Sequence, residues 1–415
     1  MDTITHGIVG ALAGKALFGG RDIPAGFAEN GVARALSSPT ARVAILGCTI
    51  GSVFPDIDIF AGPLAHNPLA IMEWHRNITH SAIMLPFWAF LLALLSIPIA
   101  RLLKWKSPPL LTLFAAYSLG IATHIFLDLV TSFGTMVWSP LQYSRSAWDW
   151  IFILDLTLTA IALAPQLAAW CYREPAQFKQ RAIGVWALLT LGAFGAYLFA
   201  RASGYGFAIF ILAVASAIFG AIIFLPAIQD AGFRWTRANW CRAALVVLCA
   251  YVGLAATAHH KAFADVQRYA AGQHWQVENL AALPLPPTLT HWVGLVNTPE
   301  GVWRTTLHEP SGAVENTVLY AGAQPSELIE EARKLRDVQM FLWFARYPVW
   351  RMRKRNGQQT VIDIFDVRFF REGVTATPGT LQSPRGNPNG RARDSGFAFR
   401  IVFDMDGRIV SHGFR

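Results

Sequence analysis

Residues 110–130 read LLTLFAAYSLGIATHIFLDLV, an apolar run whose only histidine and carboxylate, His124 and Asp128, lie near its end. A helix needs about 20 apolar residues to cross a bilayer, so this run is long enough to do so. Residues four apart lie on the same face of a helix, one turn from each other. Ionisable side chains are costly at membrane depth and are usually paired, placed in a cavity or bound to a metal. The run therefore predicts a membrane helix with a polar site near one end.

Three further motifs within residues 1–165 place His and Asp at the ends of apolar segments. They read DTITH at 2–6, FPDID at 54–58 and HRNITHS at 75–81. Imidazoles and carboxylates are metal-ligand types, so we expect these side chains to converge with His124 and Asp128 on one site. Each motif alone has a simpler structural explanation. An Asp-x-Asp pair can be a solvated turn, two nearby histidines can be a cap and a surface residue, and HxxxD is a weak signal.

The composition is that of a membrane protein with a soluble part at its C-terminal end. Apolar residues make up 53% of the 415 residues and charged residues 15%, whereas soluble domains have roughly 25% charged residues. Long apolar runs cover 80–100, 110–130, 151–171, 182–200, 206–228 and 243–261, and shorter ones cover 4–18 and 42–55. We predict a mostly α fold, with a polytopic membrane bundle of about eight helices in residues 1–262. A small α+β extramembrane domain is expected in residues 263–415.

Within that C-terminal part, Val361–Phe370 and Phe397–Phe403 alternate like strands. Asp404–Gly407 is a hairpin-turn signal, because Asp and Gly tolerate the turn geometry that joins adjacent strands. Leu328–Phe344 has the pattern of an amphipathic helix. Residues 375–396, which are rich in Pro, Gly, Arg and Asn, predict a long loop or a disordered excursion.

The distribution of basic residues predicts the orientation in the membrane. Loops 101–109, 172–181 and 229–242 carry three Lys or Arg each, whereas the alternate loops 131–150 and 201–205 carry one Arg each. By the positive-inside rule the first three loops face the cytoplasm. Counting crossings then places both termini, the His/Asp motifs and the C-terminal domain on the outer face.

Net charge and cysteine content exclude two other classes. The net charge of +9 comes from basic residues in short loops between apolar runs, which argues against a nucleic-acid partner. The four cysteines lie in or beside apolar segments without paired spacing, and we interpret them as small core residues rather than a disulfide frame. They are Cys48, Cys171, Cys241 and Cys249.

The candidate metal ligands are the His and Asp side chains of the four motifs. They are His6, Asp56, Asp58, His75, His80, His124 and Asp128. Two carboxylates as close as Asp56 and Asp58 repel each other unless a cation or protons neutralise them. We expect one to three divalent ions, Zn or Mn/Mg, with His80 as a ligand or as a proton carrier.

The expected chemistry is hydrolysis by metal-activated water, because no GxSxG motif supplies a nucleophile and the cysteines lie in apolar segments. Asp58 or Asp149 is the expected general base. Arg76 could hold a phosphate by bidentate hydrogen bonds, as could Arg145, although either Arg could instead pair with Asp149.

Two acids and two histidines lie outside the expected ligand set. Asp149 and Asp155 frame the helix that begins near 151, and a buried Asp155 would need a partner. His259 and His260 are expected to form a pair at the membrane interface rather than to bind metal.

Two alternatives to a phosphoester hydrolase stay open. A metalloprotease or amidase would use the same metal and water, although no HExxH motif is present. A metal-stabilised scaffold or a transporter would use the same buried ligands without an open coordination position. The short apolar segments at 4–18 and 42–55 are compatible with the discontinuous helices of transporters.

The ordered motifs resemble those of the YdjM-type family, whose members are described as LexA-binding, inner-membrane-associated, metal-dependent hydrolases. The resemblance covers about residues 1–165. It rests on Asp2-x-x-Thr5-His6 with Gly10 and Gly14, on the 54–58 and 75–81 motifs, and on Gly120-x-x-x-His124-x-x-x-Asp128-x-x-Thr131-x-x-Gly134. It implies a multi-pass protein of the bacterial inner membrane with a divalent-metal site, so that the outer face is the periplasmic one. LexA binding fits poorly with a site on the periplasmic face, so we do not expect it of this protein.

The same residues are more loosely similar to zinc-dependent phospholipases C and the single-strand nucleases that share their helical fold. Those proteins also order an N-terminal His, an Asp, a His and then HxxxD, here His6, Asp56, His75 and His124 with Asp128. This similarity implies a phosphate ester or phosphodiester substrate, such as a lipid head group.

Overall fold

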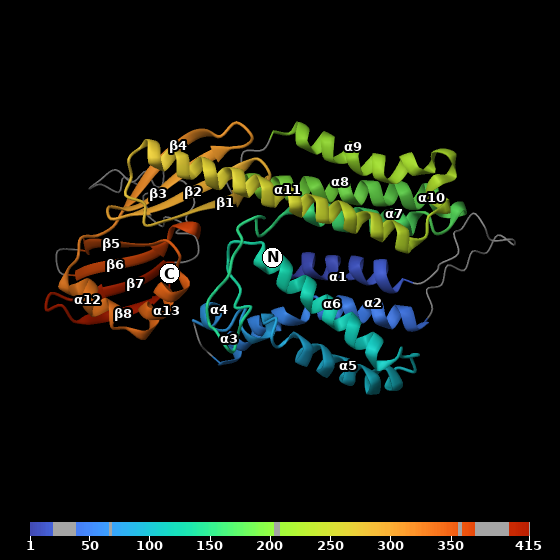
Figure 1. Cartoon of the computed structure of the whole chain (residues 1–415), viewed down its shortest axis with the longest axis horizontal. Helices are drawn as coiled ribbons and strands as arrows, with labels where there is room; N and C mark the ends of the chain where they lie inside the picture. The colour runs from blue at the N-terminus through green and yellow to red at the C-terminus, as the bar shows by residue number, and fades with distance from the viewer. Residues whose placement is uncertain (20–38, 66–68, 203–207, 356–358, 370–397, 415) are drawn as a thin grey trace.

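The computed structural model describes residues 1–19, 39–65, 69–202, 208–355, 359–369 and 398–414. A bundle of helices forms one end of the molecule and two antiparallel β-sheets form the other (Figure 1). The predicted loop at 375–396 lies outside the described residues.

The helical part begins with two short apolar helices and continues with longer ones. The elements are α1 (Thr3–Phe18), α2 (Pro39–Gly51), η2 (Phe54–Phe60), α3 (Ala61–Ala65), α4 (Ala70–Glu73), η3 (Ile78–His80), α5 (Leu85–Leu102), α6 (Leu110–Leu129), α7 (Leu156–Cys171), η4 (Pro175–Gln177), α8 (Phe178–Ala202), α9 (Phe210–Phe224), η5 (Leu225–Asp230), α10 (Ala231–Arg234) and α11 (Arg237–Gly272). Within the described residues, five helical segments are long and apolar enough to cross a membrane, or six if the bent pair of α2 and η2 is one span. The predicted polytopic helical architecture is confirmed, but the predicted count of about eight membrane helices is not.

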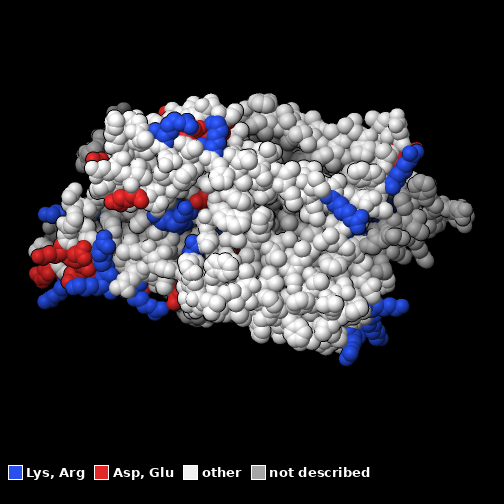
Figure 2. Space-filling model, viewed as in Figure 1, with Lys and Arg blue, Asp and Glu red and all other residues white. Residues whose placement is uncertain are grey.

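The basic loops and the sheets lie at opposite ends of the bundle. Figure 1 shows the α5–α6, α7–α8 and α10–α11 connections at the end away from the sheets. In the space-filling view, the charged side chains at that end are mostly Lys and Arg, the sheet end carries charges of both signs, and the flank of the bundle is almost free of charge (Figure 2). This arrangement suits a bundle whose middle is surrounded by lipid and whose two ends lie in water.

The inner helices approach closely because glycines face one another's backbones. A Cβ atom at Gly120 of α6 would lie 2.2 Å from the carbonyl oxygen of Cys48 in α2. A Cβ atom at Gly51 of α2 would lie 2.9 Å from the carbonyl oxygen of Tyr117 in α6. On α1, a Cβ atom at Gly10 would lie 1.9 Å from Oγ of Ser52. Small residues at such positions allow helix backbones to touch in a membrane.

The C-terminal part contains two four-stranded antiparallel sheets, each with its strands in sequence order. The first has β1 (Asn279–Leu285), β2 (His291–Thr298), β3 (Gly301–His308) and β4 (Ala313–Ala321), and the second has β5 (Pro348–Arg355), β6 (Gln359–Asp366), β7 (Ala398–Phe403) and β8 (Ile409–Phe414). Two short helices, α12 (Glu327–Arg333) and α13 (Arg336–Phe344), connect them, and η6 (Val367–Phe369) follows β6. Residues of both sheets share one apolar core that includes Leu283, Tyr347 and Phe365.

The sequence located the second sheet better than the first. The expected strands at 361–370 and 397–403 correspond to β6 with η6 and to β7, and the turn at Asp404–Gly407 leads into β8. The single helix expected at 328–344 is two helices, because Leu335 has the extended backbone of an N-cap residue. α11 continues across the predicted domain boundary at 262/263 to Gly272, and the boundary stays a prediction.

The contact between α2 and α6 can be tested with a single methyl group. We expect Gly120→Ala to lower the free energy of unfolding by about 1–3 kcal/mol, because the new Cβ would press on a backbone carbonyl that has no room to move. Thermal unfolding in detergent measures the effect. Gly192→Ala on α8 is the matched control, since a Cβ there meets nothing within 4 Å. Equal stability of the two variants would contradict the proposed close contact.

Candidate metal centre

Four buried side chains from three elements meet at the end of α6 that faces the sheets. They are Asp56 of η2, His80 of η3, and His124 and Asp128 of α6. The Nε2 atoms of His80 and His124 are 3.0 Å apart. Asp56 Oδ1 lies 3.5 Å from the first and 3.4 Å from the second, and Asp128 Oδ2 lies 3.3 and 3.5 Å from them. We call these four residues the N2O2 cluster.

The hydrogen bonds behind the two imidazoles direct their lone pairs at each other. His124 Nδ1 lies 2.7 Å from the carbonyl oxygen of Ser52, to which only a protonated Nδ1 can donate. His80 Nδ1 lies 3.2 Å from Oδ2 of Asp58, which accepts a hydrogen bond from the protonated Nδ1 in the same way. In the neutral rings both Nε2 atoms are then acceptors. Two such acceptors beside two carboxylates repel one another unless a cation or a proton lies among them.

The spacing within the N2O2 cluster suits a small tetrahedral ion. Zinc bonds of about 2.0–2.1 Å place the ligand atoms at the corners of a tetrahedron with edges of about 3.3 Å. The five distances of 3.0–3.5 Å given above lie around this value. The residues present therefore fit a bound divalent ion.

The charge balance of the cluster supports the same conclusion. Burial lowers the pKa of His80, but its hydrogen bonds with Asp128, Asp56 and Asp58 outweigh this effect and raise the pKa to about 10. The surrounding carboxylates thus demand a positive charge at this position. Without an ion a proton supplies it, and binding of an ion would release that proton.

Asp58 and His75 lie behind His80. Asp58 accepts hydrogen bonds from His75 Nδ1 at 2.8 Å, from the backbone N–H of Arg76 at 3.0 Å and from Thr79 Oγ1 at 2.9 Å. Its oxygens are therefore occupied by donors that fix its orientation towards His80. Asp58, His75 and His80 also have potential ligand atoms within 4.8 Å of one another, so this group is a second place where an ion could bind.

His6 and Arg76 contact the cluster from its other side. The ring of His6 stacks on that of His124 at 3.7 Å, and its Nε2 lies 3.2 Å from Asp128 Oδ1. Arg76 holds the same oxygen at 2.9 Å and donates to Oγ1 of Thr131 at 3.1 Å. The amino group of Met1 also contacts Asp128. One carboxylate oxygen of Asp128 is thus held by Arg76, His6 and the Met1 amino group, while the other faces the N2O2 cluster.

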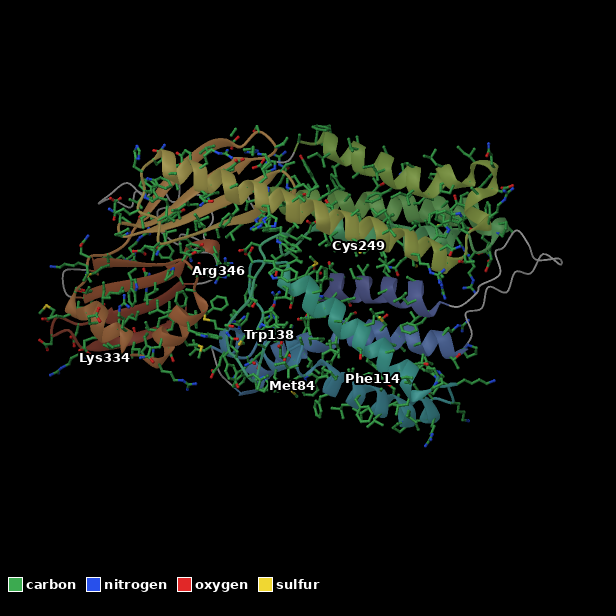
Figure 3. All side chains as sticks on the ribbon, viewed as in Figure 1. Met84, Phe114, Trp138, Cys249, Lys334 and Arg346 are labelled. Atoms are coloured by element: carbon green, nitrogen blue, oxygen red, sulfur yellow. The ribbon has the colours of Figure 1, made fainter. Side chains whose placement is uncertain are left out.

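Other candidates from the sequence lie outside the cluster. Arg346 of the C-terminal domain, labelled in Figure 3, forms a two-pronged ion pair with Asp149 at 2.9 and 2.8 Å. Asp155 caps α7 by accepting from Leu158 N at 2.9 Å, and it also accepts from the Tyr251 hydroxyl at 2.6 Å.

Arg145 and His259 are also separate from the N2O2 cluster. Arg145 donates to the carbonyl oxygens of Gly134 and His75 at 2.9 and 2.8 Å. It therefore holds the loop that contains His75. His259 packs beside Trp292 and His260 on the C-terminal side.

Some contributors carry no sequence signal of their own. The carbonyl group of Ser52 orients His124, but every residue has a carbonyl group, so no residue type marks it. Thr3 donates to Asp56 Oδ2 at 2.5 Å, although its residue type does not mark it as part of a metal site. Only the position of Thr3 one turn before His6 could have suggested its role.

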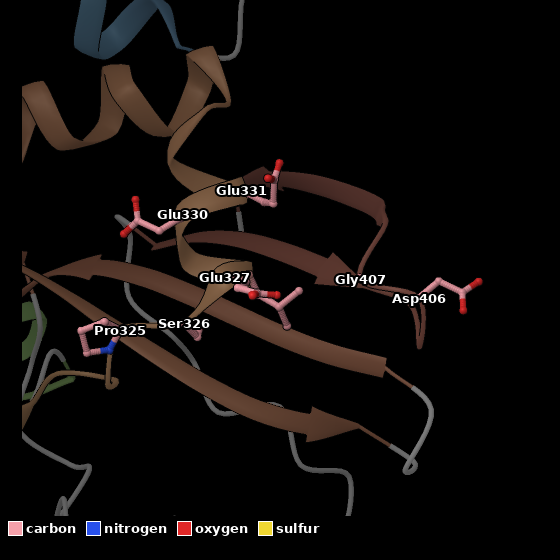
Figure 4. A pocket seen from close by; sticks show the side chains of 8 residues that line it. Pro325, Ser326, Glu327, Glu330, Glu331, Asp406 and Gly407 are labelled. Carbon is pink, nitrogen blue, oxygen red and sulfur yellow. The ribbon is translucent and has the colours of Figure 1, made fainter.

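A hollow lies on the C-terminal domain, apart from the four His/Asp motifs. Its lining includes Glu327, Glu330, Glu331 and Asp406 around the start of α12 (Figure 4). Acidic side chains on an exposed surface are common without a ligand, and no histidine lines this hollow.

Comparison with known proteins identifies a family. A family model described as YdjM inner membrane protein matches residues 1–208, which contain all four His/Asp motifs and span half of the chain. No curated protein and no solved structure matches the chain.

Metal analysis of the purified protein tests the N2O2 cluster. We expect Asp56→Asn and His124→Ala to lose most of the divalent metal that the wild-type protein carries, because each removes one of the four facing ligand atoms. Elemental analysis by mass spectrometry gives the stoichiometry. Loss of less than roughly a quarter of the metal in both variants would refute the ligand assignment, since a catalytic or structural site needs at least three protein ligands.

Two carboxylate controls sharpen that measurement. Asp149→Asn changes an acid that pairs with Arg346, and its metal content should equal that of the wild type. Asp58→Asn should keep the stoichiometry at saturating metal but bind it about 10–100-fold more weakly, as expected for a carboxylate that orients a ligand histidine.

Proposed function

The chain belongs to the YdjM family of inner membrane proteins, and we propose that its N2O2 cluster binds a divalent ion and hydrolyses a phosphate ester or phosphodiester. The observation that carries the proposal is the pair of Nε2 atoms, 3.0 Å apart and flanked by two carboxylates. Such a set has no stable arrangement in an apolar bundle without a positive charge at its centre.

Zinc is the ion we favour among Zn, Mn and Mg. Two imidazole nitrogens in the first set of contacts suit zinc, whereas Mg²⁺ prefers oxygen ligands in an octahedral arrangement. The spacing of the four atoms also supports a tetrahedral ion of this size.

A bound ion of this kind lowers the pKa of water towards neutrality and polarises a phosphoryl oxygen. The protein's own residues would hold the ion and handle its protons. His80 faces the cluster through Nε2 and Asp58 through Nδ1. His80 would therefore either bind the ion through Nε2, with Asp58 fixing its orientation, or leave Nε2 free to accept a proton from water. Both general-base candidates are held by donors, Asp149 by Arg346 and Asp58 by neighbours that include His75. Of the two we favour Asp58, because it contacts His80 of the cluster.

Arg76 is a cation beside the N2O2 cluster, where we propose that the substrate binds. Its guanidinium group is buried and held by Asp128 and Thr131. We propose that it balances the charge of Asp128 in the resting protein and contacts the phosphate when substrate is bound. The substrate would be a lipid head group or another phosphoester.

The main competing function is a structural ion without catalysis. All four residues of the N2O2 cluster are buried, and structural zinc sites are closed by four protein ligands, whereas catalytic sites keep one position for water. Under this alternative the ion would join η2, η3 and α6 in a membrane scaffold. A transporter or a metalloprotease or amidase would use the same residues, but no contact described above favours either.

Activity and stability measurements separate these functions. We expect the zinc-loaded protein to cleave a phosphodiester from a panel of phospholipids and nitrophenyl phosphates, and His124→Ala to lower the rate by roughly 100-fold or more, because the ion contributes several kcal/mol to the transition state. Asp149→Asn should keep the activity. If chelation lowers the melting temperature while no phosphoester is cleaved at any metal load, the ion is structural and the hydrolase proposal is wrong.

We also propose that the N2O2 cluster and the C-terminal domain face the periplasm. The support is the position of the Lys- and Arg-rich loops at the end of the bundle away from the sheets (Figures 1 and 2). A reporter that is active only in the periplasm, fused after residue 415, should be active. A silent periplasmic fusion together with an active cytoplasmic fusion would reverse the orientation.

A further inference from the structure

The metal cluster is separated from the outside of the bundle by a wall only one helix thick. η2 reads FPDIDIF, and its two carboxylates are directed inward. Asp56 is 6% exposed, whereas its neighbour Ile57 is 57% exposed and Phe60 is 66% exposed. The same short helix therefore presents metal ligands to one side and large apolar side chains to the other.

The apolar surface continues onto the neighbouring segments. The exposed side chains include Leu64 of α3 and Ile78 of η3. They also include Trp138 and Leu141 of the loop after α6, and Leu141 is 81% exposed. We call Ile57, Phe60, Leu64, Ile78, Trp138 and Leu141 the apolar collar. Residues 59–72 and 137–144 contain no Lys, Arg, Asp or Glu, so no charged residue within these two segments lies beside the exposed apolar side chains. Contiguous apolar surface of this kind indicates a contact with a partner or with a membrane.

The collar is continuous with a membrane-crossing helix. The indole N–H of Trp88 in α5 donates to the carbonyl oxygen of Ile78 at 3.0 Å, and Ala82 N donates to Val137 O at 2.9 Å. Trp138 and Met84, the residue before α5, lie near each other in Figure 3. α5 itself is a candidate span with exposed Phe87 and Phe90 on its surface. The collar therefore extends the lipid-facing surface of α5 beyond the beginning of that helix, where Trp is a common membrane-interface residue.

We propose that the apolar collar lies within the lipid leaflet on the site's side of the membrane, and that the substrate reaches the metal cluster from this leaflet. The second half of this statement rests on the proposed function and narrows its substrate class to a phosphate-bearing lipid. Acyl chains would stay among the collar residues while the head group approaches the cluster from the side of η2 and η3. A partner protein is the other possible occupant, but the direct continuity with α5 and the lack of charged residues favour lipid.

Site-directed quenching tests the position of the collar without reference to activity. In a Cys249→Ser background, in which the other three cysteines are buried, Phe60→Cys and Leu141→Cys are labelled with bimane in nanodiscs of brominated phosphatidylcholine. Leu198→Cys on the lipid-facing side of α8 is the positive control, and Met405→Cys in the β7–β8 turn is the aqueous control. We expect both collar positions to be quenched about as strongly as position 198. Quenching no stronger than at position 405, in protein with wild-type metal content, would refute the proposal.

A second comparison tests the route of the substrate. Zinc-loaded protein in nanodiscs should cleave a diacyl phospholipid roughly tenfold faster than the soluble head-group ester of the same chemistry, because acyl chains contribute binding energy away from the reacting atoms. Equal rates would contradict access from the leaflet while leaving the hydrolase intact. Cleavage of neither compound by metal-loaded protein, with a quenched collar, would refute the hydrolase and the lipid route together and retain only the membrane position.

Discussion

The hydrogen bond from His124 Nδ1 to the carbonyl oxygen of Ser52 is the contact on which the geometry of the metal cluster depends. α2 ends at Gly51, and the last carbonyl groups of a helix have no partner within it. His124 satisfies one such group at the end of α2, and in doing so it fixes which ring nitrogen keeps its lone pair. The bond forms only because Gly120 lets α6 touch the backbone of α2. Close helix packing and ligand orientation are therefore one constraint.

The C-terminal domain extends this constraint to the outer layer of the site. Phe133 contacts Arg76 through its ring face at 4.8 Å and packs on Phe344 at 5.1 Å. Arg368 donates to the carbonyl oxygen of Ser132 at 2.9 Å, and the pair of Asp149 and Arg346 closes the same interface. Charged groups that are removed from water need such partners, and here the partners join the two parts of the chain. The sheets consequently hold the loop that supports Arg76, and through it Asp128.

All four residues of the N2O2 cluster are buried. The possible functions therefore differ in whether a fifth ligand, such as water or substrate, can reach the ion. The thin wall of η2 and η3 carries exposed side chains on its outer side, among them Ile57 and Phe60. A structural ion needs no such entry, whereas a hydrolase does. The relation between the apolar collar and the ligands on the same short helix therefore bears directly on catalysis.

The fold and the site were predictable from sequence to different extents. Long apolar runs and basic loops indicated the membrane bundle, and the position of the two kinds of loop agrees with the ends seen in the structure. The second sheet was expected from alternation in β6 and β7. The first sheet was not located in advance, because buried strands such as β2, with HWVGLVNT, lack a regular alternation of apolar and polar residues.

By itself the sequence determined which residue types were available for the site, because histidine and aspartate in apolar segments are too costly to occur without a purpose. It also indicated that their motifs belong to one end of the bundle. Only the tertiary structure showed that four of the seven candidates face one another, that Asp58 and His75 form a second group with His80, and that His6 contacts Asp128. It also paired Asp149 with Arg346, nearly 200 positions away in the chain. The physical reason is that ligand geometry depends on ring orientation and backbone carbonyl groups, and these are set by helix packing rather than by residue type.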